Sequence, residues 1–139
     1  DVGQGDCTLV THRGDGILID AGGERTGKRA AEYVFLHSPT LEYFIITHPH
    51  EDHMGGMSEI IRNFQVDKIV LPSIDETKIT AKWYNRLMDS LSSGKYELEV
   101  AEKGKTYHID DVEIKIISDE SYQGSNINNY STVLKISYG

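Results

Sequence analysis

Three histidines and two carboxylates lie within residues 48–53 of this chain, which read His-Pro-His-Glu-Asp-His. Neutral imidazoles and carboxylate oxygens are ligands that suit Zn²⁺ and similar first-row ions. His48 and His50 are two residues apart, so on an extended backbone both side chains leave the same face and can grip one metal ion. Asp52 and His53 are adjacent and must diverge. The spacing therefore predicts two neighbouring metals, one on His48 and His50 and the other on Asp52 and His53.

The remaining histidines and the one cysteine do not belong to a comparable cluster of candidate ligands in the sequence. A single histidine at a turn is commonly solvated or hydrogen-bonded to a neighbour, and we expect no more of His12, His37 and His108. Cys7 is the only cysteine, and its place in a predicted strand favours a small buried residue over a nucleophile. A purely structural zinc site normally uses four Cys and His ligands, so a single distant cysteine disfavours that alternative.

The elements on either side of the cluster indicate where it lies in a fold. Leu41–Thr47 is a short run of apolar, β-branched and aromatic residues, typical of a strand buried on both faces. Residues 57–64 place apolar side chains at the spacing of an amphipathic helix. The cluster is thus predicted on a loop between the carboxyl end of a strand and a helix, where open α/β sheets bind ligands. Gly55 and Gly56 follow it, either to let backbone approach a metal or substrate, or to make a tight loop with positive φ.

The rest of the chain alternates strand and helix patterns. Strands are predicted at residues 7–12, 17–20, 68–71, 96–100, 106–109, 112–117 and 132–138, and helices at residues 28–37 and 79–91. Turn residues between the first two strands, and again at Asp110-Asp111, predict two β-hairpins. Strands interspersed with helices favour an α/β or mixed sheet, and the absence of repeats and linkers indicates one domain.

Composition argues against some classes of function but does not identify one. The net charge is −8, from 22 acidic and 14 basic residues. This balance argues against a broad nucleic-acid footprint, because such a footprint is normally basic. No stretch approaches the ~20 apolar residues of a membrane span, so no membrane segment is expected and the cytoplasm is favoured as the location.

Several stretches resemble the metallo-β-lactamase superfamily of binuclear metallohydrolases. They are Thr47 to His53, the following Met54-Gly55-Gly56, and Leu18 to Gly22 upstream. The opening residues Asp1 to Asp6 and the late residues Asn128 to Leu134 further resemble the hydrolase domain of ComEC-type DNA-uptake competence proteins of bacteria. The resemblance implies an α/β (α+β) fold, namely an αββα sandwich of mixed sheet flanked by helices, with metals at one edge of the two sheets.

The resemblance also assigns the ligands position by position. His48 and His50 would bind the first metal, and Asp52 and His53 the second. Two Zn²⁺ are expected per full-length domain, with Mn²⁺ or Fe as alternatives. Asp52 would also orient the attacking water, which makes it the candidate catalytic residue.

Four further residues are implied around the metals. Asp20 would brace the ligand loop from behind, and Asp6 would lie near the site. Asn128 and Ser131 fall about where other branches of the family carry a further histidine for the first metal, and that histidine is absent here.

The resemblance covers nearly all of residues 1–139 but only the first half of the family's domain. The metal-bridging Asp and the last histidine of the family come later than Gly139. The resemblance therefore implies a truncated domain that binds metal weakly and is inactive alone. It also implies that the second sheet is missing, which would leave an exposed apolar sheet face that favours self-association.

Together these features predict a metal-dependent hydrolase that uses zinc-activated water in the full-length protein. A phosphodiester or related ester, in a small molecule or in nucleic acid, is the substrate class that the narrower resemblance implies. The alternative is a non-catalytic module that keeps the fold for binding or regulation.

Overall fold

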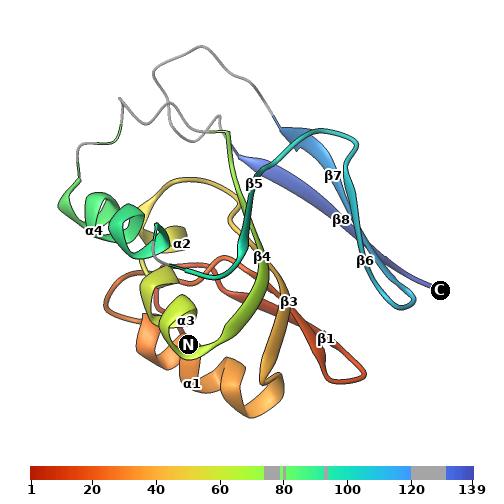
Figure 1. Cartoon of the computed structure of the whole chain (residues 1–139), viewed down its shortest axis with the longest axis horizontal. Coiled ribbons are helices and arrows are strands. Elements are labelled where there is room, and N and C mark those ends of the chain that lie inside the picture. The colour runs from red at the N-terminus through yellow and green to blue at the C-terminus, as the bar shows by residue number, and fades with distance from the viewer. Residues whose placement is uncertain (74–78, 80, 93, 120–130) are drawn as a thin grey trace.

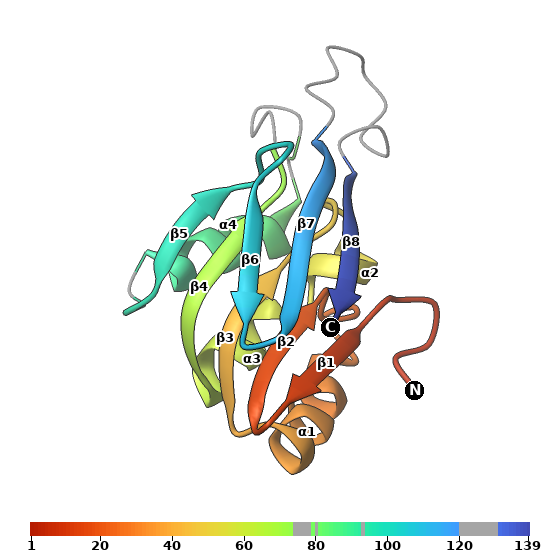
Figure 2. The same ribbon diagram turned by 90° about the vertical axis from the view of Figure 1, so that its right-hand side faces the viewer.

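Two β-sheets pack face to face, and helices cover the outer face of the larger sheet, in the computed structural model of the chain (Figure 1, Figure 2). The structure describes residues 1–73, 79, 81–92, 94–119 and 131–139. The five-stranded sheet has the order β1-β2-β3-β4-β5 and the three-stranded sheet the order β6-β7-β8. The strands are β1 (Thr8–His12), β2 (Asp15–Ile19), β3 (Thr40–Ile45), β4 (Gln65–Leu71), β5 (Glu97–Val100), β6 (Thr106–Ile109), β7 (Val112–Asp119) and β8 (Thr132–Tyr138). The helices are α1 (Gly27–His37), α2 (Glu51–Met54), α3 (Met57–Asn63) and α4 (Lys82–Leu91).

The five-stranded sheet is mixed, as the sequence predicts. β1 and β2 form the expected antiparallel hairpin, with Arg13 and Gly14 at φ 52° and 103° in its two-residue turn. Positive φ at both central positions is what a type I′ turn requires, and its twist matches that of the flanking strands. β2, β3, β4 and β5 then run parallel to one another. Their carboxyl ends therefore meet at one edge of the sheet.

β3 is buried on both faces, which confirms the prediction for residues 41–47. Phe44 packs in the core between the sheet and the helices, and its neighbour Ile45 packs in the core between the two sheets. Both side chains are 0% exposed. The alternation follows from the two-residue period of a strand. Burial on both faces holds β3, the strand that leads into the histidine cluster, in the centre of the fold.

The prediction of a simple loop after β3 is wrong in one respect. A short helix, α2, occupies Glu51–Met54, and only Gly55 and Gly56 separate it from α3. The last ligand candidates, Asp52 and His53, therefore lie on a helical turn rather than on a loop. The helical backbone turns these two adjacent side chains in different directions.

The second sheet, which the resemblance implies to be missing, is present in part as β6-β7-β8 and covers one face of the larger sheet. Cross-strand pairs on the outer face of this small sheet join Glu113 to Ser137 and Lys115 to Lys135, while the alternate residues Ile114 and Ile116 are buried against the larger sheet. The described residues supply three layers of the αββα arrangement, helices, large sheet and small sheet. The small sheet also exposes apolar side chains at Ile117, Val133, Ile136 and Tyr138, and the predicted self-association stays a prediction.

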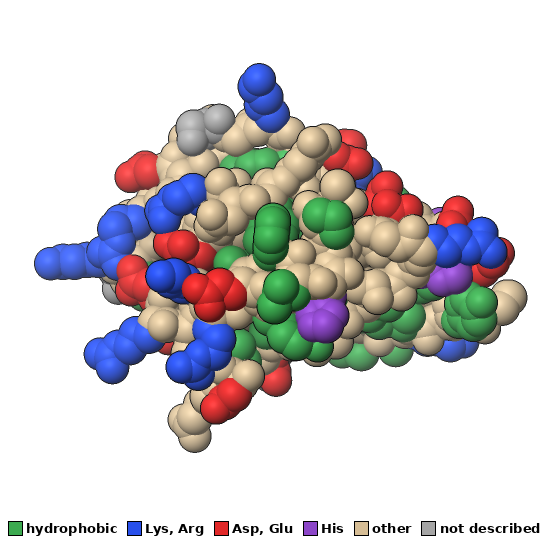
Figure 3. Space-filling view, turned by 90° about the horizontal axis from the view of Figure 1, so that it is seen from below, with side chains coloured by type: hydrophobic (Ala, Val, Ile, Leu, Met, Phe, Trp, Pro, Cys, Tyr) green, Lys and Arg blue, Asp and Glu red, His purple; other side chains and the backbone are tan. Residues whose placement is uncertain are grey.

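A further group of exposed apolar side chains lies on α1. Tyr33, Phe35 and Leu36 are 57%, 66% and 78% exposed. The surface seen from below, where α1 lies, carries hydrophobic side chains near its middle with charged groups to either side (Figure 3). None of the helices in the described ranges has the length and apolar character to cross a bilayer.

Phe44 and Phe35 provide a matched test of this packing. Because Phe44 is fully buried and Phe35 is 66% exposed, we expect Phe44→Ala to lower the free energy of unfolding by about 3–5 kcal/mol. Phe35→Ala should change it by only about 0.5 kcal/mol. Urea unfolding followed by circular dichroism measures both, and equal losses would contradict the assignment of β3 to the core.

Candidate metal centre

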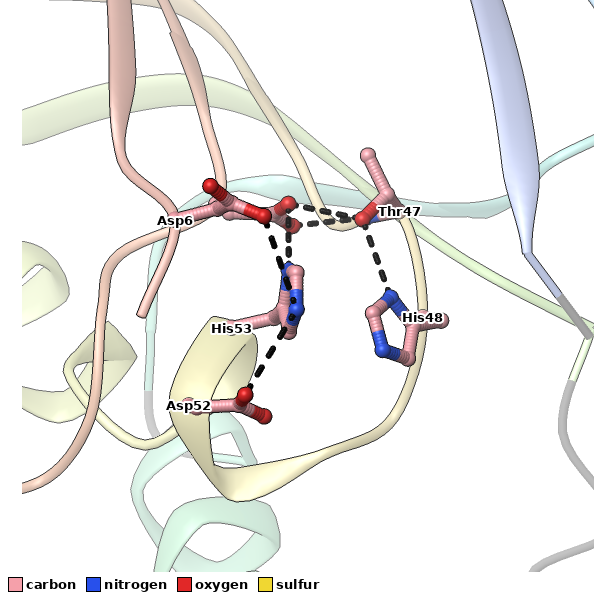
Figure 4. Close-up of polar contacts among 6 residues, drawn as sticks. Asp6, Thr47, His48, Asp52 and His53 are labelled. Atoms are coloured by element: carbon pink, nitrogen blue, oxygen red, sulfur yellow. Dashed lines mark hydrogen bonds and ion pairs between the residues drawn. The ribbon is translucent and has the colours of Figure 1, made fainter. Parts of the chain in front are cut away.

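The candidate ligands converge because two parallel strands end side by side. β2 pairs with β3 up to the register Ile19 with Ile45, so the residues that follow each strand emerge at the same edge of the sheet. Asp20 follows β2, and the His48 segment follows β3. α2 then folds back so that Asp52 and His53 face the same space (Figure 4).

Three of the predicted ligands form a compact group. One donor atom from each of His48, His50 and Asp52 lies within 4.8 Å of the others, and all three side chains are half-buried. The rings of His48 and His50 have centroids 5.0 Å apart, and those of His48 and His53 only 3.8 Å apart. All four residues thus meet at one place. The closest group of three joins Asp52 to the first histidine pair, and the division into two metal sites stays a prediction.

Asp20 is the buried anchor of the cluster. It is 3% exposed, and its carboxylate accepts hydrogen bonds from Thr47 N at 2.8 Å, Thr47 Oγ1 at 2.7 Å and His53 Nδ1 at 2.9 Å. Burial raises the pKa of this carboxyl, and the hydrogen bonds from Thr47 and His53 oppose the rise. Asp20 also has φ 58°, a left-handed conformation that costs energy outside glycine and that these three bonds hold in place. Through Thr47 and His53, Asp20 contacts both ends of the segment that carries the candidate ligands.

Asp20 also determines which nitrogen of His53 can bind a cation. An ionised carboxylate only accepts hydrogen bonds, so His53 Nδ1 must carry the proton that it donates. In the neutral ring, Nε2 then has the free lone pair. A carboxylate behind a ligating histidine is the usual way in which proteins orient such a ring.

Thr47 extends this control to His48, and sequence reasoning missed it. Its hydroxyl donates to Asp20 Oδ2, so its oxygen remains to accept from His48 Nδ1 at 3.3 Å. Desolvation by burial, followed by the charges of His53 and His50, lowers the pKa of His48 to about 4. The ring is therefore neutral at pH 7 and presents Nε2 as a ligand. Nothing in the sequence distinguishes this threonine from one that ends a strand.

Two carboxylates face the free nitrogen of His53. Asp6 Oδ2 lies 3.7 Å and Asp52 Oδ2 3.9 Å from His53 Nε2. A divalent cation placed at Nε2 would be stabilised by these two oxygens. A divalent metal fits this donor set, which consists of imidazole nitrogen and carboxylate oxygen.

Close backbone packing, rather than the predicted glycine roles, shapes the site. Gly55 and Gly56 have φ −62° and −77°, so the prediction of a positive-φ loop is wrong for both. A Cβ at Gly56 would lie 2.2 Å from Ala21 O, and one at Gly5 would lie 2.4 Å from Asp52 O. These glycines let the loop after β2, the N-terminal segment and α2 touch backbone to backbone, as in the bond from Asp6 N to Asp52 O at 3.1 Å.

Of the two late candidates, Asn128 and Ser131, the structure describes only Ser131. Asn128 lies outside the described residues. Ser131 directly precedes β8, whose Thr132 is 4% exposed and donates its N–H to Thr47 O at 2.6 Å. Ser131 therefore lies beside the ligand segment, as the resemblance implies.

Comparison with known proteins gives this geometry a family context. The family model of the metallo-beta-lactamase superfamily matches residues 1–126. Recombination protein 2 of Haemophilus influenzae is 37% identical over 78 residues, which cover 52% of this chain and 10% of that protein. ComE operon protein 3 of Bacillus subtilis is 24% identical over 160 residues, which cover 100% of this chain and 20% of that protein. The chain thus spans a fifth or less of the length of these two relatives.

Solved structures agree on the fold. A metallo-beta-lactamase of Cronobacter sakazakii with a HARLDQ motif matches with a TM-score of 0.63 at 14% identity, covering 95% of this chain and 48% of that chain. MEM-A1, a subclass B3 metallo-beta-lactamase from a soil metagenome library, matches with a TM-score of 0.57 at 14% identity, covering 79% of this chain and 44% of its own. Identities this low show a common fold and nothing about the substrate.

Asp20→Asn tests the buried anchor with little change of shape, because asparagine tolerates the left-handed conformation. The amide can donate to His53 Nδ1, which frees the ring to protonate Nε2. We expect Zn²⁺ affinity, measured by competition with a chromophoric chelator, to fall about 10–100-fold. Asp15→Asn, at the other end of β2, is the matched control and should leave the affinity unchanged. Equal affinities for wild type and Asp20→Asn would contradict the anchor role.

Cys7 should behave as a packing residue, as the sequence predicts. It packs against the core on the helix side of the sheet, and burial, reinforced by the charge of Asp20, raises the pKa of its thiol to about 11. Because the thiolate is the reactive form, iodoacetamide at pH 8 should label the native chain at least about 10-fold more slowly than the urea-unfolded chain. Mass spectrometry over time measures both rates, and equal rates would identify an accessible, reactive thiol.

Proposed function

The chain belongs to the metallo-β-lactamase superfamily, and on that premise we propose that it supplies the metal-binding half of a metal-dependent hydrolase. The observation that supports this most is the grouping of His48, His50 and Asp52, with His53 in ring contact with His48. We further propose that residues 1–139 act as one domain. Because the chain covers only part of its relatives, the activity belongs to the whole protein in which it occurs.

The proposed ligands divide as the spacing suggests. His48 and His50 would hold one metal ion, and Asp52 and His53 would hold the second. Zn²⁺ suits this nitrogen and oxygen set, and Mn²⁺ or Fe are the alternatives. When bound, a divalent ion supplies Lewis acidity and lowers the pKa of water from 15.7 to about 7.

The chain's own residues then perform the remaining tasks. Asp52 accepts a hydrogen bond from the attacking water through its carboxylate and so fixes the direction of attack. Asp20 and Thr47 keep Nδ1 of His53 and His48 occupied, so that Nε2 of each ring faces the site. No serine or cysteine nucleophile is required, which agrees with the raised pKa of the Cys7 thiol.

A phosphodiester is the proposed substrate class, with other esters as the wider class. The likeness to Recombination protein 2 and ComE operon protein 3 supports this choice. The charge of −8 favours a small or local contact with the substrate over an extended basic track.

Metal removal tests the proposal. In the whole protein, chelation should reduce hydrolysis of bis(4-nitrophenyl) phosphate to the background rate, and added Zn²⁺ or Mn²⁺ should restore it. His50→Ala should prevent the recovery, while His108→Ala, on the outward face of β6, should recover fully. Turnover that survives chelation would eliminate the mechanism.

Metal content separates the proposal from its rival. Stoichiometric Zn²⁺ together with turnover supports the hydrolase. Bound Zn²⁺ without turnover of any phosphodiester or carboxylic ester would instead identify a non-catalytic module that keeps the fold for binding or regulation.

A further inference from the structure

The segment of residues 47–50 carries two of the candidate ligands and is held by its backbone only at its ends, as far as the described residues show. At its start, the carbonyl oxygen of Thr47 accepts a hydrogen bond from Thr132 N at 2.6 Å. At its end, the carbonyl oxygen of His50 accepts hydrogen bonds from the N–H groups of α2. The position of His48, which lies between these ends, therefore depends on how Thr47 is held.

Thr47 is held by both sheets. Asp20, which follows β2 of the large sheet, accepts hydrogen bonds from the N–H and the hydroxyl of Thr47. Thr132, the first residue of β8 in the small sheet, donates its N–H to the carbonyl oxygen of Thr47. This oxygen belongs to the peptide group that joins Thr47 to His48. The hydrogen bond from the small sheet thus acts directly on the backbone of a candidate ligand.

Thr132 presents its N–H from a paired and buried strand end. Its side chain is only 4% exposed. β8 pairs with β7 along its whole length, from Thr132 to Tyr138, and β7 buries Ile114 and Ile116 against the large sheet. The donor therefore has a defined position relative to the strands that end at the candidate metal centre.

We propose that Thr132 is a positioning residue, whose main-chain N–H holds the peptide group between Thr47 and His48 so that Nε2 of His48 faces the metal. A peptide group is planar, so holding its oxygen also holds the Cα of His48 and the direction in which its side chain leaves the backbone. The small sheet is then part of the support of the ligands. This inference rests on the proposed function, because it concerns the metal ion that His48 and His50 would hold.

Removing the N–H of residue 132 tests this role through metal binding. Proline has no N–H and is accepted as the first residue of a strand. We expect Thr132→Pro to lower the Zn²⁺ affinity of the position formed by His48 and His50 about 10-fold, measured by competition with a chromophoric chelator. Thr132→Val is the matched control, because it keeps the N–H and nearly the same side-chain volume, and it should bind Zn²⁺ as the wild type does.

An ester bond at residue 132 is the second variant, and it is needed if circular dichroism shows that the proline variant does not fold. Introduced by semisynthesis, the ester replaces the N–H with oxygen and leaves the side chain unchanged. It should lower the affinity as proline does. Wild-type affinity in the ester variant, or an equal loss in Thr132→Val, would overturn the role of Thr132.

The ¹⁵N resonances of the histidine rings separate positioning from a general loosening of the fold. At the Zn²⁺ concentration that half-saturates the wild type, the response of His48 should weaken in the ester variant. The response of His53 should persist, because Asp20 holds that ring. Equal losses at both rings would overturn the proposal. If the variants behave as expected but the whole wild-type protein turns over no ester, the positioning role stands and the proposed hydrolase fails.

Discussion

A buried carboxylate that must satisfy three donors is the constraint on which the site depends. Asp20 is nearly inaccessible to water, and it receives both the N–H and the hydroxyl of Thr47 as well as Nδ1 of His53. Leaving such a group without partners would cost several kcal/mol. The same three bonds therefore stabilise the fold and set the protonation pattern of the imidazoles. The hydrogen bonds to Asp20 thus stabilise the fold and also orient the candidate ligand His53.

The sheet brings these groups together before any metal binds. β2 and β3 are parallel, so residues far apart in sequence leave the sheet at one edge. The loop after β2 can approach the ligand segment because Gly56 and Gly5 leave room for backbone contact. A methyl group at either position would force the segments apart. The ligands are thus held by backbone packing below them and by Asp20 behind them.

Much of this could be predicted from sequence, and the limits have physical causes. The β3 segment was predictable because burial on both faces leaves a continuous apolar run. The histidine cluster was predictable because so dense a set of ligands has no packing role. The hydrogen bonds of Thr47 were not, since they depend on which strand lies beside β3.

The presence of the small sheet was not predicted, for another reason. Its three strands could be predicted one by one, but the pairing of β7 with β8 joins segments that are separated in the chain. The helical turn of α2 was missed because four residues carry no helical period.

Nitrogen NMR of the histidine rings tests the central claim most directly. In ¹⁵N-labelled protein at pH 7, the account predicts protonated Nδ1 and unprotonated Nε2 for His48, protonated Nδ1 for His53, and a shift of the Nε2 resonances of both rings when Zn²⁺ is added. Rings protonated on Nε2 whose resonances do not respond to Zn²⁺ would contradict it.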